Sequence, residues 1–552
     1  MPQVLRCLGS RIPGACVCLL LLTPAYAQIV EAGGASSANV STPKFSLSGT
    51  VVNSVTGEPV RRALVQIYMG PEQAMLTDSD GRFEFSNLPS GQTSIAVRKP
   101  GFMSDQEIPG GGPPSMVETG PDAKPITVKL TPEGVLFGRV DSKGEPIEDL
   151  PVKVIALRIE QGRKHWEQRG GAMTDEDGAW RIANLPPGTY FIAAGPSFRR
   201  NRFGPRSKSV PDGYAEGFYP AASDISGAMP VEVGAGQQVE ADFSLKPAPV
   251  FHISGVVTGI EPGEGVGMEL ANESDVTSMG MRFATATGEF ETRAPAGSYR
   301  LQAWSRGQDG ETFKASMPLN VTSDVSGIRL ALAPDTSILI HVKLEKLAPE
   351  NPENGRFIFR RSDNSVPVDV RLIATELSFR NHDIGTTRIQ KPGSPPEMLL
   401  KDIEPGKYSV EFEPNFPWYV YSAQSGAINL LTEDLQVGSG MRPEPIEIVL
   451  RDDAASISAK ISSPGQPSRG AVLVIPNGAP RRTKTEFVTE GAEMQMSGLA
   501  PGAYSVIALD HVDGLEYISP EVIGPYLSNA QHVVLQPNQK LELNLDLTRV
   551  RE

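Results

Sequence analysis

Short runs in which apolar and polar residues alternate recur along this chain, and turn-forming residues separate them. In one run Tyr408, Val410 and Phe412 are apolar, whereas Ser409 and Glu411 between them are polar. Successive side chains of a β-strand point to opposite faces, so this alternation predicts strands with one buried face. Gly and Pro end such runs roughly every 8 to 12 residues, a spacing typical of β-sandwiches.

A Pro-Gly turn motif recurs five times, each time directly before one of these runs. Pro fixes its own φ at about −65° and Gly accepts a positive φ, so the motif predicts a chain reversal between two strands. Successive copies are 96 to 109 residues apart, much further than the repeats of about 20 to 50 residues in solenoids. The spacing therefore predicts complete domains in tandem. The motif glycines are Gly91, Gly188, Gly297, Gly406 and Gly502.

A tyrosine stands two residues after the motif glycine in four copies, and Thr93 takes its place in the first. We expect this tyrosine to be a corner residue that packs its ring and bonds its hydroxyl locally, rather than a catalyst. The four tyrosines are Tyr190, Tyr299, Tyr408 and Tyr504.

These patterns predict an all-β chain: about five tandem antiparallel β-sandwich domains, prealbumin-like or immunoglobulin-like, after a signal peptide. Residues 1–27 are the predicted signal peptide, and residues 28–43 are a predicted flexible leader rich in Ala, Gly and Ser. The predicted domains are block 1 (residues 44–131), block 2 (132–249), block 3 (250–334), block 4 (335–452) and block 5 (453–552).

Three segments depart from the strand pattern. Residues 109–125 are rich in Gly and Pro and are predicted to form a loop inside block 1. Pro247-Ala248-Pro249 predicts a stiff boundary after block 2. Residues 349–376 in block 4 match no strand of the repeat, so no element is predicted there.

The first residues follow the order typical of a secretory signal. Arg6 and Arg11 precede an apolar run at residues 15–22, and Ala25-Tyr26-Ala27 ends the segment with small residues. The run is too short to cross a hydrocarbon core of about 30 Å as a helix. We therefore expect cleavage before Gln28 and export to the periplasm, the cell surface or the medium; the alternative is a buried helix.

Composition narrows the class of partner. Loss of Arg6 and Arg11 with the signal would change the formal net charge from −14 to −16, which argues against nucleic acid or an anionic membrane as partner. All three cysteines lie inside the predicted signal, so the exported chain is expected to be stable without disulfides. No later stretch is apolar enough to predict a membrane helix.

Two motifs of block 1 return in block 2. Thr-Asp-Ser-Asp-Gly-Arg-Phe at 77–83 matches Thr-Asp-Glu-Asp-Gly-Ala-Trp at 174–180, and Asn-Leu-Pro-Ser-Gly at 87–91 matches Asn-Leu-Pro-Pro-Gly at 184–188. Through these motifs blocks 1 and 2 resemble the carboxypeptidase regulatory-like domain, a transthyretin-like sandwich. Blocks 3, 4 and 5 look like diverged relatives. The resemblance implies a non-catalytic domain, and the chain has no His-x-x-Glu pair of the peptidase type.

The Asp-x-Asp-Gly segments of blocks 1 and 2 raise the question of calcium. In the first, an EF-hand register would place Leu76 at position one and Asn87 at position twelve, and neither is a suitable ligand. Block 2 has the same mismatch. We therefore favour a hairpin turn in which Asp78 or Asp175 bonds nearby backbone and the following glycine takes a positive φ.

No other motif predicts chemistry. The chain has no nucleophile elbow and no phosphate-binding glycine loop, so we predict no catalytic residue, no metal and no cofactor. A hydrolase that uses dispersed carboxylates is the alternative. The histidines show no metal-binding spacing; they are His165, His252, His341, His382, His511 and His532.

Two aromatic clusters are the candidate binding residues. Exposed rings can hold sugar faces or partner side chains, whereas the alternative is that these rings fill the end of a sandwich or a seam between domains. The clusters are Tyr214, Phe218 and Tyr219 in block 2, and Trp418, Tyr419 and Tyr421 in block 4.

The sequence thus predicts a non-catalytic exported protein that acts as a binding and spacer scaffold at the cell envelope. Its expected partner is an envelope protein or a polysaccharide, bound by repeated modules rather than by one strong site. The alternative function is carbohydrate binding through the aromatic clusters.

Overall fold

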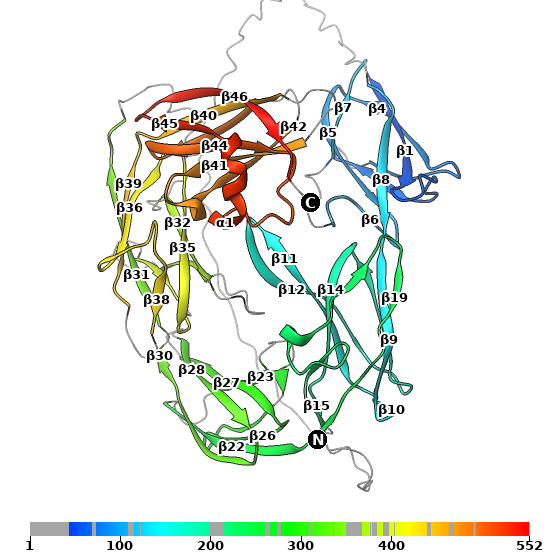
Figure 1. The fold of residues 1–552 in the computed structure, drawn as a ribbon, viewed down its shortest axis with the longest axis vertical. Helices are drawn as coiled ribbons and strands as arrows, with labels where there is room; N and C mark the ends of the chain where they lie inside the picture. Colours follow the sequence, from blue (N-terminus) through cyan, green and yellow to red (C-terminus); the bar gives the residue numbers. More distant parts are fainter. Residues whose placement is uncertain are drawn as a thin grey trace, which may run out of the picture.

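The fold is described from a computed structural model, which is built almost entirely of β-strands (Figure 1). The predicted signal peptide and leader lie outside the described residues. The residues described are 44–68, 73–108, 115–121, 123–198, 213–259, 265–272, 278–279, 281–307, 312–334, 336–348, 367–375, 377, 384–389, 397–401, 403–438, 443–462, 469–489 and 493–550.

Block 1 is a sandwich of two four-stranded sheets with the strand orders β4-β1-β8-β6 and β3-β2-β5-β7. Alternate residues of β1 and β5 point into one shared core, which includes Leu47, Val51, Ile95 and Val97. The strands are β1 (Phe45–Asn53), β2 (Leu64–Ile67), β3 (Gln73–Leu76), β4 (Arg82–Leu88), β5 (Gly91–Arg98), β6 (Phe102–Met103), β7 (Ser115–Thr119) and β8 (Ile126–Pro132).

Block 2 repeats this plan with longer strands and an added small sheet, β15-β16-β21. Its main sheets are β10-β9-β13, with β19 and β20 also on β9, and β12-β11-β14-β17, with β18 also on β14. The elements are β9 (Gly134–Ser142), β10 (Glu145–Pro146), β11 (Pro151–Glu160), β12 (Arg163–Met173), β13 (Ala179–Leu185), β14 (Gly188–Ala194), β15 (Ser197–Phe198), β16 (Gly213–Tyr214), β17 (Gly217–Phe218), η1 (Ile225–Gly227), β18 (Val231–Val233), β19 (Gln238–Glu240), β20 (Phe243–Ser244) and β21 (Pro247–Ala248).

Block 3 again has two sheets, β25-β26-β22-β29 and β24-β23-β27-β28-β30, around a core of its own. The strands are β22 (Val250–Thr258), β23 (Val266–Asn272), β24 (Ser278–Met279), β25 (Arg282–Ala284), β26 (Glu289–Pro295), β27 (Gly297–Arg306), β28 (Thr312–Val321), β29 (Val325–Ala331) and β30 (Ala333–Pro334).

In block 4 the two layers join into one nine-stranded sheet, because β33 pairs with both β34 and β32. The sheet encloses one apolar core. The strands are β31 (Ile338–Glu345), β32 (Val368–Ala374), β33 (Ile384–Ile389), β34 (Glu397–Leu400), β35 (Gly406–Pro414), β36 (Tyr419–Ser425), β37 (Ile428–Asn429), β38 (Leu435–Val437) and β39 (Ile446–Arg451).

Block 5 likewise forms one curled sheet, in the order β42-β41-β44-β46-β40-β43 with β45 also on β44. It alone carries an α-helix among the described residues, which no sequence pattern predicted. The elements are β40 (Ala455–Ser462), β41 (Arg469–Pro476), η3 (Pro480–Arg482), β42 (Lys484–Thr489), β43 (Glu493–Leu499), β44 (Gly502–Leu509), α1 (Pro520–Ile523), η4 (Gly524–Asn529), β45 (Gln531–Leu535) and β46 (Lys540–Thr548).

The sandwich prediction is confirmed, but each block also contains at least one parallel strand pair. The opening strand of every block lies parallel to the closing strand of the same block. Parallel neighbours need a long crossover, and here the remainder of the block provides it. The opening and closing pairs are β1 with β8, β9 with β19 and β20, β22 with β29, β31 with β39, and β40 with β46.

The predicted role of the repeated tyrosine is confirmed in all four copies. Each ring is buried, and each hydroxyl donates a hydrogen bond to the carbonyl oxygen four residues earlier. For Tyr299, Tyr408 and Tyr504 these bonds are 2.9, 2.8 and 2.7 Å long. In block 1, where Thr93 replaces the tyrosine, the hydroxyl of Thr119 donates to Pro89 O at 2.7 Å instead.

The left-handed residue of the turn precedes the motif glycine by four positions. Asn87 has φ 65° and Asn184 has φ 58°, and Gly498 occupies the same place in block 5 with φ 69°. Asn tolerates this conformation better than other residues with a Cβ. The positive φ predicted at the motif glycine is confirmed in three copies, at 144° for Gly91, 159° for Gly188 and 153° for Gly502.

The Asp-x-Asp-Gly segments are hairpin turns, as favoured from the sequence. Asp78 Oδ1 accepts hydrogen bonds from the backbone N–H groups of Asp80 and Arg82 at 2.9 and 2.8 Å, and Gly81 has φ 70°. Block 2 repeats these bonds at Asp175 Oδ1, which accepts from Asp177 and Ala179 at 3.0 and 2.8 Å.

Three segments differ from their predictions. Residues 349–376, where no element was predicted, include β32 (Val368–Ala374), which pairs with β33 and β35. The predicted loop at residues 109–125 contains β7, which pairs with β5 and becomes an edge of block 1. The predicted boundary Pro247-Ala248-Pro249 contributes β21, which pairs with β16. β7 and β21 are both edge strands, and Pro247 is tolerated in β21 because one side of an edge strand needs no backbone donor.

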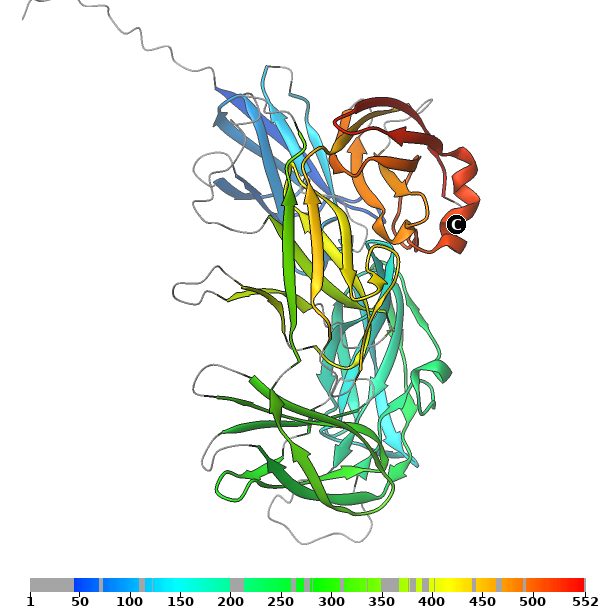
Figure 2. The ribbon, with the colours of Figure 1, turned by 90° about the vertical axis from the view of Figure 1, so that its left-hand side faces the viewer.

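The blocks do not form a straight string. The chain descends through blocks 1 and 2, turns at block 3, and returns through block 4, so that block 5 lies beside the β11–β12 hairpin of block 2 (Figures 1 and 2). Side-chain contacts confirm that blocks 2 and 5 touch, since Lys164 Nζ lies 2.7 Å from Glu516 Oε2. No helix in the described part of the chain is both long and apolar enough to cross a membrane.

Gly178→Ala should destabilise block 2 more than Gly144→Ala. Both glycines have a positive φ, 68° and 83°, so alanine costs about 1–2 kcal/mol at either site. Only at Gly178 would the new Cβ also lie 2.5 Å from Val140 O, whereas nothing lies within 4 Å at Gly144. Hydrogen exchange of β13 measures the effect, and equal losses in the two variants would contradict the close approach.

Candidate functional site

A cavity of about 1070 Å³ lies where blocks 2, 4 and 5 meet, and we call it the junction cavity. Residues 159–163 at the tip of the β11–β12 hairpin line one side. Residues 409–414 of β35 and residues 481–487 of block 5 line two others. Its walls therefore come from segments that are far apart in the sequence and depend on the turn of the chain through block 3.

The tip of the hairpin fits closely against block 5. Gly162 has φ 75°, and a Cβ there would lie 3.0 Å from two ring carbons of Tyr517 and 3.1 Å from Ile518. Tyr517 is itself buried. Only glycine satisfies both the backbone conformation and the contact.

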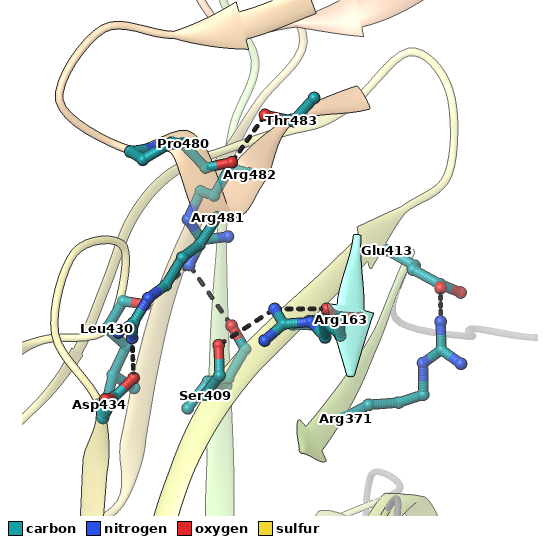
Figure 3. A network of polar contacts seen from close by, with 12 residues as sticks. Arg163, Arg371, Ser409, Glu413, Leu430, Asp434, Pro480, Arg481, Arg482 and Thr483 are labelled. Atoms are coloured by element: carbon teal, nitrogen blue, oxygen red, sulfur yellow. Dashed lines mark hydrogen bonds and ion pairs between the residues drawn. The ribbon is translucent and has the colours of Figure 1, made fainter. Parts of the chain in front are cut away.

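Two ion pairs fasten the same hairpin to its neighbours. Arg163 Nη2 lies 2.9 Å from Glu411 Oε1 and also donates to Ser409 Oγ at 3.4 Å, both in block 4 (Figure 3). Lys164 Nζ lies 2.7 Å from Glu516 Oε2 in block 5. The Arg163 and Glu411 side chains are only 20% and 24% exposed, so solvent screens this pair less than a fully exposed one. One hairpin of block 2 thus contacts both later blocks.

Arg482 links block 5 to block 4 through backbone carbonyls. Its Nε donates to Leu431 O at 3.0 Å and its Nη2 donates to Leu430 O at 2.7 Å. The guanidinium carbon lies 5.0 Å from the ring centroid of Phe412, within cation–π distance. Burial lowers the pKa of Arg482 to about 10, against the opposing effect of Glu411, so the side chain is still charged at neutral pH.

A buried carboxylate makes a second contact between blocks 4 and 5. The Asp434 side chain is 5% exposed and pairs with Arg481 of block 5 (Figure 3). On its own block, Lys407 Nζ lies 3.2 Å from Asp434 Oδ2. A buried carboxylate needs such partners, because removing an ion from water without them costs several kcal/mol.

Block 5 has a second apolar cluster that supports this wall. The segment 510–530, with α1 and η4, covers the outer face of β41 and β44 and positions Glu516 and Tyr517 toward the hairpin. The buried members are Ala471, Leu473, Ile475, Ile507, Leu509, Val512, Leu515, Tyr517 and Ile523.

The block 2 aromatic cluster lies mostly inside the protein. Phe218 is 3% exposed and packs with Ile155 and Ala193. Tyr214 and Tyr219 are half-buried against the main core of block 2. These rings fill space between strands, so a ligand could reach them only in part.

The block 4 cluster is divided between core and surface. Tyr419 is 4% exposed and donates its hydroxyl to Asp453 Oδ1 at 2.9 Å, and Trp418 packs against the core of block 4. Tyr421 is 51% exposed, with the guanidinium carbon of Arg451 3.2 Å from its ring centroid. The two clusters lie in different blocks, and only Tyr419 of the six lines the junction cavity. That any of the six binds a ligand stays a prediction.

Arg163, Arg482 and Gly162 were not among the candidates from the sequence. No motif marks them, since their partners are as much as 355 positions away along the chain. Among the residues described, no group of three or more His, Cys, Asp or Glu side chains could hold a metal ion. His382 lies outside those residues.

A buried lysine lies in block 2, on the β11 strand. Burial lowers the pKa of Lys153 to about 8, and the nearby Glu216 carboxylate partly opposes this shift. Burial raises the pKa of Tyr299 in block 3, and the same carboxylate adds to this shift. Glu216 therefore acts on titratable groups of two blocks.

Gly162→Ala should release the hairpin from block 5 for two reasons. Alanine disfavours the positive φ at this position, and its Cβ would lie 3.0 Å from the Tyr517 ring. Gly144→Ala is the matched control, with φ 83° and no atom within 4 Å. Energy transfer between dyes on cysteines placed at the exposed positions Glu176 and Gln536 measures the separation. We expect lower transfer in Gly162→Ala alone; equal transfer in both variants would contradict the contact.

Stability that depends on Lys153 should rise with pH between about 8 and 10.4. The unfolded chain, with a lysine pKa of about 10.4, binds more protons than the native state throughout that window. Lys153→Met should remove this rise and stabilise block 2 at pH 7. The urea midpoint, followed by the fluorescence of Trp166 and Trp180 with Trp304 and Trp418 replaced by Phe, tests it. An unchanged pH profile in Lys153→Met would contradict the assignment.

Comparison with known proteins identifies one block directly. Residues 46–123 match the family of the carboxypeptidase regulatory-like domain. No curated protein sequence matches the chain.

Several solved structures resemble parts of the chain. The Bacillus anthracis TIE protein is 14% identical, with 53% of this chain and 50% of that protein covered and a TM-score of 0.17. The minor pilin of Streptococcus agalactiae is 14% identical over 37% of this chain and 97% of its own, with a TM-score of 0.21. The shaft pilin SpaA of Lactobacillus rhamnosus GG is 9% identical over 37% and 98%, with a TM-score of 0.20.

The aligned region spans only half of the Bacillus anthracis protein. At these identities and TM-scores nothing about partners or assembly transfers to this chain. The family match and the sheets described above lead to one conclusion: the chain is an all-β protein that contains a carboxypeptidase regulatory-like domain at residues 46–123.

Proposed function

We propose that this chain is an exported, non-catalytic scaffold of the cell envelope, whose blocks are domains that bind and position partner molecules. We propose as domain boundaries the residue ranges given above for blocks 1 to 5. The observation that carries the proposal is the fastening of blocks 2, 4 and 5 around one cavity by the β11–β12 hairpin. Such contacts favour a preorganised binding surface over a flexible spacer.

The composition and the fold both support this role. Each block buries its own apolar core, so its outer surface is not needed to form that core and can carry recognition. Function on sandwich folds resides in surface sites rather than in the fold itself. A formal charge of −14 favours solubility and partners that are neutral or basic.

The proposal is tested by export and by envelope binding. Expression of the full chain in a bacterial host should yield a form outside the cytoplasm that starts at Gln28, identified by its mass. Purified residues 28–552 should bind isolated envelopes saturably, and pretreatment of the envelopes with protease or glycosidase identifies the partner class. Cytoplasmic retention together with non-saturable binding would reject the proposal.

Carbohydrate binding is the second candidate, and the exposed ring of Tyr421 favours it. Tyr421→Ala should weaken retention on a polysaccharide panel, because an exposed aromatic face can stack on a sugar ring. Tyr68→Ala is the matched control, since Tyr68 in block 1 is exposed to a similar degree, 50% against 51%. Retention that both variants leave unchanged would remove this candidate.

A further inference from the structure

One strand on the wall of the junction cavity has an unpaired edge. β42 is an end strand of the block 5 sheet, and among the described strands it pairs with β41 alone. An end strand presents a row of backbone N–H and C=O groups that can pair with another chain. The feature therefore offers a template for one more strand.

The junction cavity runs along this edge. Four consecutive residues of β42, Lys484 to Phe487, line it, although alternate side chains of a strand point to opposite faces. The cavity therefore borders side chains from both faces of this part of β42. Lys484, Glu486 and Phe487 are exposed, and Phe487 is 66% exposed, so both faces of the strand are accessible.

Among the described residues that line the cavity, seven are carboxylates and four are cations, so the wall is acidic overall. Each cation on its wall already has a partner: Arg163 has Glu411, Arg481 has Asp434, and Arg482 and Lys484 have backbone carbonyls. By contrast, three carboxylates of the wall form no ion pair with any described residue. They are Glu433, Glu486 and Asp513.

We propose that the junction cavity receives an extended basic segment of a partner protein, which adds as a strand to the free edge of β42. Backbone hydrogen bonds to the edge would supply affinity, and alternate side chains would supply specificity. Lys or Arg residues of the segment would lie near Glu433, Glu486 and Asp513, and apolar residues would contact Phe487. The inference rests on the proposed binding function and names its site and class of partner.

The β11–β12 hairpin of block 2 closes one side of the cavity with residues 159–163. Its Arg163 forms an ion pair with Glu411 of β35, so the negative charge of that carboxylate is already neutralised. The unpaired carboxylates lie on blocks 4 and 5. An incoming segment is thereby directed toward β42 rather than toward β35.

The test uses an acetylated octapeptide of alternating lysine and valine, titrated into purified residues 28–552. Binding should slow hydrogen exchange in β42. The same peptide with N-methylated central residues keeps its charge but loses its backbone donors, so it should bind at least tenfold more weakly. Slowed exchange elsewhere but not in β42, or equal binding of the methylated peptide, would overturn the proposal.

Charge-reversal variants distinguish binding at β42 from general attraction of the basic peptide to the negatively charged protein. Glu486→Lys should weaken binding of the peptide about fivefold, the upper range for one partly exposed ion pair. Glu84→Lys makes the same change on an exposed strand of block 1 and should have no effect. Equal weakening by both would show attraction to net charge only and would overturn the proposal.

The two proposals fail in different ways. If the chain is exported and binds envelopes saturably but gives no protection of β42 by the peptide, the site is wrong and the scaffold function stands. If the peptide protects β42 but export and envelope binding fail, the envelope role is wrong instead.

Discussion

The parallel pairing of the first and last strand within each block is the constraint on which the rest of the structure depends. In blocks 1 and 3 the pairing needs a very close approach, since a Cβ on Gly49 or Gly255 would lie 2.5 or 2.3 Å from a carbonyl oxygen of the closing strand. Because its first and last strands pair with each other, each block closes around a core of its own. Much of the apolar surface is therefore buried inside the individual blocks.

That closure determines what kind of contact can hold the blocks together. The junction of blocks 2, 4 and 5 uses ion pairs, carbonyl acceptors and one tightly packed glycine rather than a continuous apolar interface. Polar contacts of this kind are individually weak in water, but they demand specific geometry. The junction is thus better suited to fixing an arrangement than to driving folding.

The features that could be predicted from the sequence are local ones. The Pro-Gly turn, the tyrosine that follows it and the Asp-x-Asp-Gly hairpins each involve residues within a few positions, so pattern and turn chemistry were sufficient. The parallel strand pairs and the junction were not predictable, because Gly162 and Tyr517 carry no mutual signal across 355 positions. The positive φ predicted at the motif glycine is present at Gly91 and Gly502, but the left-handed conformation of Asn87 and Asn184 was not predicted.

In the block 4 aromatic cluster, a β-bulge changes which side chains face the core. Tyr419 and Tyr421 are two positions apart and should share a face, but the register between β36 and β39 shifts between Val420 and Ser422. This bulge leaves Tyr419 in the core and places Tyr421 outside under Arg451. Alternation is a property of regular ladders and fails at a bulge.

The path of the chain changes what repetition can achieve here. A straight row of sandwiches would give reach, and its sites would act independently along a line. This chain returns on itself, so β42 of the last block faces a hairpin of the second across one cavity. Sheet edges are normally shielded because they invite unwanted pairing. An edge left open inside a charged cavity admits only a segment that fits its walls, and the surrounding blocks then act as a filter for what can pair with it.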